Sequence, residues 1–358
     1  MGERTTARRL LRAACGGVFA ALALGCATSQ MNQIDALMRE YSGNVPGASV
    51  LVVRDGNVLV RQSFGMANLE EHIAAAPDTN YRLASLTKQF TAASILLLGI
   101  PLDDSIRKYL PSLPPYADAI TIRHLLTHAS GLLAYEDLIP ADRTQQLTDT
   151  DVLDLLAKTN TTYFPPGTQY RYSNTGYVFL SLIVERVSGQ RFADFLREKI
   201  FIPAGMNHSG ISTVTHRAYG YSRGGQAILP AQGQAGSPVL HWVRTDQSVT
   251  SATLGDGGIY TSIDDLVHWI AWLDSGRFDQ APVPATKTDR PGMQYGFGWF
   301  IGEHRGRRMV SHFGETIGFR NAIVRFPDQR LAVVVLTNRN EGVPEGTALR
   351  IADMFLPP

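Results

Sequence analysis

Ser85 and Lys88 are the residues of this chain whose types and spacing most directly suggest chemistry. On a helix, residues three apart lie on the same face, so the Ser85-x-x-Lys88 tetrad would place a hydroxyl beside an amine. A serine hydroxyl is a weak nucleophile until a neighbouring base removes its proton, and Lys88 could act as that base. The start of a helix also carries a partial positive charge where an oxyanion would develop. The pair therefore indicates nucleophilic catalysis by Ser85.

The tetrad is not specific when taken alone, because a motif of two fixed residues is expected by chance roughly once in a chain of this length. Ser105 and Lys108 form a second copy in this sequence. That copy follows a polar turn and leads into Pro111, without an apolar helix to hold it, so we expect a surface turn there. Ser85 by itself could equally be an ordinary helix cap. Other motifs have to decide between these interpretations.

Two further groups of polar residues follow in the chain. Tyr172-x-Asn174 comes directly before a helical pattern and offers a phenol as proton acceptor and an amide for a substrate carbonyl. His312-x-Gly314 lies at the end of a predicted strand, where a small residue allows a substrate to lie along the strand edge. A hydroxyl, an amine, a phenol and an imidazole could form an acylation site if the fold brings these segments together.

The elements that must position these motifs are strands near both ends of the chain and helices between them. A hairpin is predicted over 47–53 and 58–64, and strands return at 295–302, 308–312, 322–325 and 331–337. Helical patterns cover 88–99, 121–128, 149–159, 175–188, 192–199, 262–273 and 347–355, with Ser262 as the expected N-cap of the helix that follows it. Residues 214–252 are rich in Gly, Gln, Ser and Pro and are expected to form a long loop with one short strand at 239–243.

This order predicts an α+β fold. One antiparallel sheet would be built from the N- and C-terminal segments and flanked by helices, with a mostly helical lobe inserted in the middle. The tetrad lies at the first junction between sheet and helix, and a cleft between two such lobes is a usual place for a site.

The composition is that of a globular protein with a sizeable core. The chain has 358 residues, of which 44% are hydrophobic and 18% charged, and its formal net charge is +1. Outside the N-terminal leader it has no dense run of Lys and Arg, which argues against a nucleic-acid partner. The composition leaves the oligomeric state open.

The N-terminus reads as a targeting segment. A basic region with four arginines precedes the apolar residues 13–24, which are too few for a comfortable membrane span. The segment ending at Cys26 resembles a bacterial lipobox, in which the cysteine is lipidated and becomes the first mature residue. We therefore expect a signal peptide over 1–25, a short linker over 26–32 and a single two-lobed domain over 33–358. The protein would be exported and held in the periplasm or cell envelope as a lipoprotein.

Two observations limit this interpretation. The lipobox match is imperfect because Ala23 occupies a position that usually carries Leu, so an ordinary signal peptide cut near Ala23 is the alternative. Both cysteines, Cys15 and Cys26, lie in the leader. The folded body after Cys26 therefore contains no intrachain disulfide, no thiolate nucleophile and no metal held by cysteine.

Together the motifs resemble the serine beta-lactamase-related hydrolases. This family includes class C beta-lactamases, D-alanyl-D-alanine carboxypeptidases, D-aminopeptidases and family VIII carboxylesterases. The resemblance covers about residues 33–356, and its landmarks occur in family order. They are residues 81–91, 120–132, 164–168, 256–258 and 295–299, in addition to the motifs described above.

The resemblance implies a role for each candidate residue. Ser85 would attack a carbonyl and become acylated, and water would then release the acyl group. Lys88 and Tyr172 would share the transfer of its proton to the leaving group, and which of the two is the base stays open. Asn174 would help to place the substrate. The family implies neither a cofactor nor a metal, and the partner would be a small-molecule or peptide substrate.

The third motif would complete the site on the opposite strand. By resemblance, His312 would lie across the cleft and assist proton transfer or substrate placement. The oxyanion hole would use the backbone N–H groups of Ser85 and of Glu315, the residue after Gly314.

The chain departs from the beta-lactamase pattern at this motif. Beta-lactamases usually carry Lys, then Thr or Ser, then Gly, where this chain has His312-Phe313-Gly314. Histidine is largely neutral near pH 7 and phenylalanine has no hydroxyl, so the partners for a substrate carboxylate are missing. We therefore expect a carboxylesterase or D-amino-acid peptidase. A true class C-like beta-lactamase or a cell-wall DD-carboxypeptidase is the alternative within the enzymes.

Two interpretations from other classes were also considered. His124 and His128 have the i, i+4 spacing of metal ligands, but Leu125 stands where a zinc protease needs Glu. The family resemblance places this segment in a structural helix, and we expect no metal. A non-catalytic binding protein on the same fold would have lost the nucleophile or its base, whereas both Ser85 and Lys88 are present.

Overall fold

The computed structural model of the protein describes residues 28–228 and 239–357. The expected signal peptide over 1–25 and the expected lipidation site, Cys26, lie outside these residues. In the described part, no helix combines the length and apolar character needed to span a bilayer. The chain separates into two units, Met1–Ser42 and Gly43–Pro358. In the first unit residues 28–37 are helical, so a helix occupies most of the segment expected as a linker.

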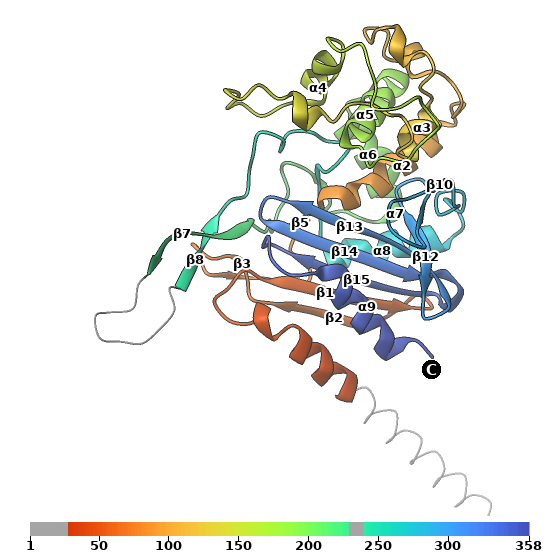
Figure 1. Ribbon diagram of the computed structural model, residues 1–358. Helices are drawn as coiled ribbons and strands as arrows, with labels where there is room; N and C mark the ends of the chain where they lie inside the picture. Colours follow the sequence, from red (N-terminus) through yellow and green to blue (C-terminus); the bar gives the residue numbers. More distant parts are fainter. Residues whose placement is uncertain (1–27, 229–238, 358) are drawn as a thin grey trace, which may run out of the picture. The chain divides into compact units, whose positions relative to one another are not determined.

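The second unit is built on an eight-stranded sheet in the order β10-β11-β12-β13-β14-β15-β1-β2, with every neighbouring pair antiparallel. The N-terminal hairpin pairs with the last strand of the chain, which confirms the predicted antiparallel sheet built from both ends (Figure 1). The strands are β1 (Ala48–Arg54), β2 (Asn57–Phe64), β10 (Thr286–Lys287), β11 (Gln294–Tyr295), β12 (Phe300–His304), β13 (Arg307–Thr316), β14 (Phe319–Phe326) and β15 (Leu331–Thr337).

The core of this unit lies on both faces of the sheet. Every residue of β15 is buried, and so are six of the seven residues of β1. Side chains alternate between the two faces of a strand, so continuous burial requires a cover on each face. Helix α9 (Pro344–Phe355) packs on β14 and β15, and helix α8 (Ile263–Asp274) packs on β1 and β15. Ser262 caps α8 as predicted, because its hydroxyl accepts a hydrogen bond from the N–H of Asp265.

The predicted helical lobe is present, and its helices come between the two groups of strands in chain order. In Figure 1 the lobe lies above the sheet. Its central helix is α5 (Asn174–Ser188), which is buried over most of its length and packs against α2, α3, α4 and α6. The bounds of these neighbours are Thr87–Leu98 for α2, Ile122–Leu126 for α3, Asp149–Leu156 for α4 and Phe192–Leu196 for α6. A π-helical turn, Arg197–Phe201, and the short α7 (Ile202–Ala204) follow.

Short strands connect the sheet to the helical lobe. A small sheet in the order β5-β9-β6 is formed by β5 (Tyr81–Arg82), β9 (Ile259–Thr261) and β6 (Gly210–Ile211), and a two-stranded sheet by β3 (Met66–Asn68) and β4 (Ile73–Ala74). Strand β5 ends directly before the segment that carries Ser85. The second Ser-x-x-Lys copy forms a short 3₁₀ turn, Ile106–Lys108, which Ser105 caps. Its isoleucine is buried, whereas Lys108 is exposed and pairs with Asp104.

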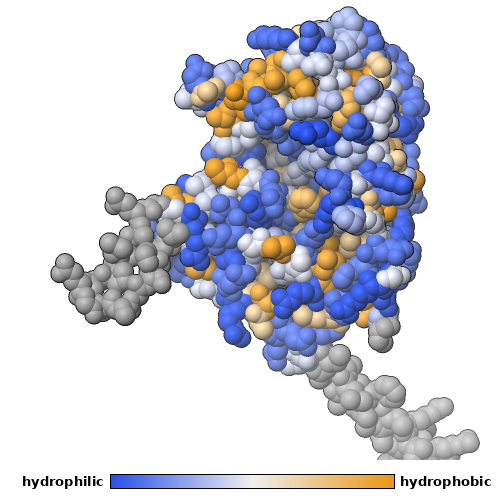
Figure 2. All heavy atoms as spheres, viewed as in Figure 1, coloured by the Kyte–Doolittle hydropathy of each residue, from blue (hydrophilic) through white to orange (hydrophobic). Residues whose placement is uncertain are grey.

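The expected long loop over 214–252 is only partly a loop. The predicted strand near 239–243 is present as β8 (Val239–Arg244), but it pairs with β7 (Tyr221–Ile228), which the Gly- and Gln-rich sequence did not indicate. The face of the molecule shown in Figure 2 is mostly hydrophilic with scattered apolar side chains, as expected when the apolar residues are in the core.

Candidate active site

Ser85 lies just before the helix that carries Lys88. It belongs to a 3₁₀ turn, Ala84–Leu86, and α2 begins at Thr87. Ala84 has a φ of 50°, a left-handed conformation that non-glycine residues rarely adopt and that is often found at functional sites. In this arrangement the Lys88 Nζ is 3.0 Å from the Ser85 Oγ. The structure therefore brings together the hydroxyl and the amine of the tetrad.

Lys88 is fully buried and its amine has two further acceptors. Nζ donates to the Oδ1 of Asn174 at 2.8 Å and to the backbone O of Asp256 at 2.9 Å. Burial lowers the pKa of Lys88 to about 8, against the opposing effects of the Asp256 and Glu136 carboxylates. A lysine with this pKa can lose its proton close to neutral pH, as a general base must.

Tyr172 stands on the other side of the same amine. The Lys88 Nζ lies 5.0 Å from the centre of the Tyr172 ring. Burial raises the pKa of Tyr172 well above its usual value, and its hydrogen bond with Ser85 opposes this effect. The phenol therefore keeps its proton near neutral pH.

Asn174 is the first residue of α5, and its side-chain amide forms hydrogen bonds with two charged groups, the amine of Lys88 and the carboxylate of Glu136. Its Oδ1 accepts from Lys88, and its Nδ2 donates to the Oε1 of Glu136 at 2.7 Å. Ser173 caps the helix by accepting from the N–H of Gly176, which fixes the start of α5 beside the site. Because a carboxylate only accepts hydrogen bonds, Glu136 holds the amide with its oxygen toward Lys88.

Strand β13 presents an edge to the nucleophile. Strand β12 accompanies β13 only as far as Ser311, so on that side the part of β13 from His312 to Thr316 has no partner among the described strands. A side-chain carbon added at Gly314 would lie 2.1 Å from the backbone O of Leu83 and 3.2 Å from the backbone N of Ser85. Glycine is thus required here for close approach of the two backbones, rather than for room along the strand edge.

His312 lies close to the site, but both of its ring nitrogens are engaged. Its Nδ1 donates to the backbone O of Phe313 at 2.7 Å, so its Nε2 carries no proton and accepts from the Oη of Tyr295 at 2.9 Å. The side chain is buried, and burial together with the charge of Lys88 lowers the pKa of His312 to about 3. The sequence predicted that His312 assists proton transfer or substrate placement across the cleft. With both nitrogens engaged, His312 would have to do this through Tyr295.

A small cavity of about 100 Å³ lies over Ser85. Its lining includes three acidic side chains, Glu136, Asp256 and Glu315, and Glu315 pairs with Arg320 at 3.4 Å. The remaining lining residues are Arg82, Ala84, Tyr135, Asn174, Thr250, Thr253, Gly257 and Thr316. The polar lining and the excess of carboxylates make this cavity more suitable for a cationic than for an anionic group.

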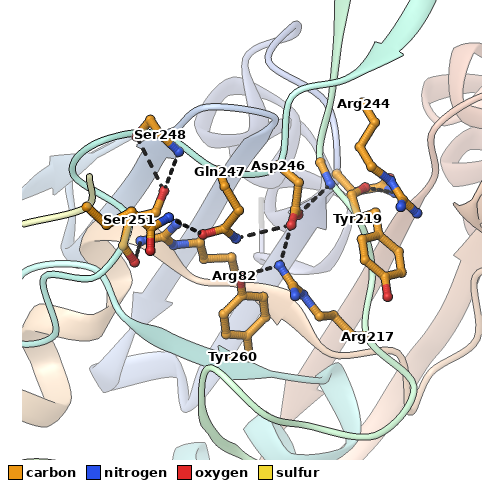
Figure 3. Close-up of polar contacts among 12 residues, drawn as sticks. Arg82, Arg217, Tyr219, Arg244, Asp246, Gln247, Ser248, Ser251 and Tyr260 are labelled. Carbon is orange, nitrogen blue, oxygen red and sulfur yellow. Dashed lines mark hydrogen bonds and ion pairs between the residues drawn. The ribbon is translucent and has the colours of Figure 1, made fainter. Parts of the chain in front are cut away.

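One wall of the cavity includes Thr250, Thr253, Asp256 and Gly257. The chain from 246 to 257, which contains these residues, is held by two arginines, Arg82 and Arg217 (Figure 3). Arg82 donates to the backbone O of Ser251 at 2.9 Å and to that of Gly257 at 3.3 Å. At the far end, Asp246 accepts from Arg217, from the backbone N–H of Gly220 at 3.0 Å and from Gln247 at 3.1 Å. This clamp fixes the Asp256 carbonyl that accepts from Lys88.

Sequence reasoning missed several residues of the site. Asp256 and Tyr295 were recognised only as family landmarks, without a role. Glu136 was not singled out, because a single acidic residue in a short turn carries no signal of its own. The Tyr135 Oη donates to Asp256 at 3.2 Å, so the turn at 135–138 supports both Asn174 and Asp256. A Tyr-Glu dipeptide in a turn is too common for the sequence to have indicated that Tyr135 and Glu136 support the site.

Comparisons with known proteins identify the relatives of this chain. The beta-lactamase family model matches residues 34–355. The chain is 31% identical to penicillin-binding protein 4* of Bacillus subtilis over 329 residues, which are 86% of this chain and 72% of that protein. It is 30% identical to a D-aminopeptidase of Brucella canis over 351 residues, 91% of this chain, but spans only 62% of that protein's length.

A solved structure agrees with the fold as well. The octameric penicillin-binding protein homologue from Pyrococcus abyssi superposes with a TM-score of 0.75 at 26% identity, covering 93% of this chain and 77% of that one. The antiparallel sheet with flanking helices and a helical lobe is therefore the beta-lactamase and transpeptidase-like fold. This chain belongs to the beta-lactamase family and is a serine hydrolase.

Proposed function

We propose that the protein acts through an acyl-enzyme on Ser85 and cleaves an amide or ester whose acyl part carries a free amino group, as in a D-amino-acid amide or peptide. The observation that carries this proposal is the buried Lys88 amine, 3.0 Å from the hydroxyl of Ser85, which itself lines a cavity together with three carboxylate side chains. The D-aminopeptidase relatives support it.

The first step would be the attack of the Ser85 Oγ on the substrate carbonyl. Its proton would pass to the neutral amine of Lys88, because the lowered pKa of Lys88 makes this group the better base, while the raised pKa of Tyr172 keeps the phenol protonated. The backbone N–H groups of Ser85 and Glu315 would stabilise the oxyanion. Tyr172 would then pass a proton to the leaving group and be reprotonated from Lys88. A water molecule would release the acyl group by the reverse route.

The charges of the cavity support an amine-bearing substrate. Glu136 uses one oxygen to hold Asn174 and stands at the mouth of the cavity, where an ammonium group could pair with it. Among the described residues that line the cavity, a substrate carboxylate would find one cation, Arg82, against three carboxylates, and the Nε and Nη2 of Arg82 already donate to backbone carbonyls. His312 is neutral and Phe313 has no hydroxyl. These features disfavour the beta-lactamase and DD-carboxypeptidase alternatives.

The complete set of polar groups also disfavours a non-catalytic binding protein. Ser85, Lys88 and Asn174 are connected by hydrogen bonds, and Tyr172 lies beside them. An active-site serine probe should attach covalently to the wild-type protein and not to S85A. Failure of the folded wild-type protein to react would contradict the proposed function.

The test of substrate class is a parallel assay of a short-chain aryl ester, a D-alanyl anilide and a chromogenic cephalosporin, with wild-type protein and E136Q. Glutamine keeps an acceptor for Asn174 but removes the charge. For the anilide, kcat/KM should fall roughly 10- to 100-fold, as expected on losing a charged hydrogen bond. The aryl ester, which has no amine, should change by less than about twofold when measured on the alkaline plateau, where Lys88 is already neutral and loss of the Glu136 charge does not change the amount of neutral amine. Equal losses on both substrates, or fast cephalosporin turnover, would overturn the proposed substrate class.

We also propose that the protein is exported and anchored in the cell envelope by lipid on Cys26. The basic and apolar leader with its lipobox-like end supports this. The wild-type protein should fractionate with membranes and incorporate a labelled fatty acid, and C26S should do neither. A wild-type protein recovered in the soluble periplasmic fraction would instead support the ordinary signal peptide.

A further inference from the structure

The histidine pair at 124 and 128 has no part in the proposed reaction, and the structure gives its two members different surroundings. The His124 Nδ1 accepts from the backbone N–H of Thr121, so this ring closes the first turn of α3. His128 follows the helix, is fully buried, and has a φ of 56°. A left-handed non-glycine residue is strained, and such residues often occur at functional sites.

His128 makes three contacts with consecutive residues of the segment that contains Tyr172. Its backbone O accepts from the N–H of Arg171 at 2.9 Å, and its Nδ1 accepts from the N–H of Ser173 at 3.1 Å. Its ring lies against the Tyr172 ring, with 4.3 Å between centres and 36° between planes. The residues on both sides of Tyr172 and the phenol ring itself are thus fixed by one histidine.

The protonation of His128 is also fixed. Because the Nδ1 accepts from a backbone N–H, the proton of the neutral ring is on Nε2. This nitrogen is buried and has no hydrogen-bond partner among the described residues. A second hydrogen bond therefore does not contribute to the position of the ring, and the ring contact with Tyr172 is the shortest that the ring makes with a tyrosine. Burial lowers the pKa of His128 well below its usual value, and the charge of Lys88 acts in the same direction, so the contact does not change with pH in the working range.

We propose that His128 is a positioning residue for Tyr172, which it holds at the place beside Ser85 where the phenol can transfer a proton. This proposal rests on the proposed function, in which Tyr172 carries the proton to the leaving group. A proton donor that is displaced by about 1 Å can cost roughly 100-fold in rate, so the support of such a side chain matters as much as its presence.

The surroundings of Tyr172 show what else could affect it. The titratable and hydroxyl-bearing side chains that face it, in addition to His128, are Ser85, Lys88, Tyr170, Tyr177, Asp256, Tyr295 and His312. Of these, Tyr170, Tyr177 and Tyr295 also contact the His128 ring, with centres 4.5–5.9 Å away. A general loosening of this aromatic group has to be distinguished from a displacement of Tyr172 alone.

A double-mutant cycle makes this distinction. The cycle uses H128N, Y172F and the combined variant, with H124N as the matched control. Asparagine tolerates a left-handed backbone and can accept from the N–H of Ser173, so H128N removes mainly the ring that backs Tyr172. We expect kcat on the aryl ester to fall roughly 10- to 100-fold, with KM within about twofold. H124N should lower the melting temperature without changing kcat.

The coupling between the two residues decides the outcome. If His128 acts through Tyr172, H128N should lower kcat by less than about twofold in the Y172F background. H128F, which keeps a ring against Tyr172, should retain more activity than H128N. If H128N does not fold, the same cycle can be run with H128G, because glycine also adopts a left-handed backbone and removes the ring.

Three outcomes would overturn the proposal. They are the same loss from H128N in both backgrounds, an increase in KM with kcat unchanged, and an equal loss of kcat in H124N. Failure of the proposed function is separate, because it would show in the wild-type protein as absence of covalent labelling at Ser85.

Discussion

At the scale of single residues, Lys88 determines how the rate should depend on pH. Burial lowers the pKa of Lys88 to about 8, and only the neutral amine can accept the Ser85 proton. We therefore expect kcat/KM to rise from about pH 6 and to level off above about pH 8. His312 and Tyr172 should add no second step in this range, because the pKa of His312 is lowered to about 3 and that of Tyr172 is raised well above its usual value. A profile measured with an aryl ester, corrected for spontaneous hydrolysis, checks this.

K88R is the control for this profile. A guanidinium keeps its proton throughout this pH range, so the variant should lose the rising limb together with roughly 10²- to 10⁴-fold in kcat/KM. A kcat/KM of the folded wild-type protein that does not change with pH would contradict the assignment of Lys88 as the base.

The sequence could predict those site residues whose partners are near in the chain. Ser85 and Lys88 are one helical turn apart, so their spacing alone indicates the contact that the structure shows at 3.0 Å. The pair of Glu136 and Asn174 is 38 positions apart, and it forms because a short turn crosses the start of α5. Nothing in the local sequence encodes that crossing. The catalytic roles of all these residues stay predictions until the variants above are measured.

At the scale of secondary-structure elements, the approach of β13 to the nucleophile can be tested through Gly314. An added methyl group would lie 2.1 Å from the backbone O of Leu83, so the strand would have to move away from Ser85. G314A should lower the free energy of unfolding by about 1–3 kcal/mol and slow covalent labelling of Ser85 by roughly tenfold or more. Denaturant unfolding and probe kinetics measure the two effects.

Gly224 provides the matched control for this substitution. It also lies in a strand, β7, but a methyl group there would meet no atom within 4 Å. G224A should therefore change the free energy of unfolding by less than about 0.5 kcal/mol and leave labelling unaffected. Normal labelling of folded G314A would show that this strand does not need to approach Ser85 so closely.

The elements that the sequence predicted well are those whose own residues indicate their structure. The apolar runs of β1 and β15 are long and rich in valine, and both form strands as expected, paired with each other and each with a further neighbour in the sheet. Strand β7 contains two adjacent glycines and forms a two-stranded sheet with β8. This pairing is a tertiary contact, which local propensity does not encode.

At the scale of the whole molecule, Asp149 joins the helical lobe to the wall of the cavity. It begins α4, accepts a hydrogen bond from the Ser181 hydroxyl on α5 at 2.5 Å, and accepts another from the backbone N–H of Leu254 at 2.8 Å. Burial raises the pKa of Asp149 from 3.8 to about 7, although both hydrogen bonds favour the charged form. The folded protein therefore holds this proton more tightly than the unfolded chain does.

The sign of the resulting pH effect follows from this difference. Between about pH 4 and pH 7 the folded state binds more protons at Asp149 than the unfolded state, so the contribution of this residue to stability falls as pH rises. In D149N the amide oxygen can accept from Leu254 and the amide nitrogen can donate to Ser181, so both contacts survive without the buried charge. D149N should match the wild-type melting temperature near pH 4 and exceed it increasingly up to about pH 7, with a constant difference above. Thermal unfolding of both proteins across this range measures the difference, and one that does not change with pH would show that Asp149 ionises normally in the folded protein.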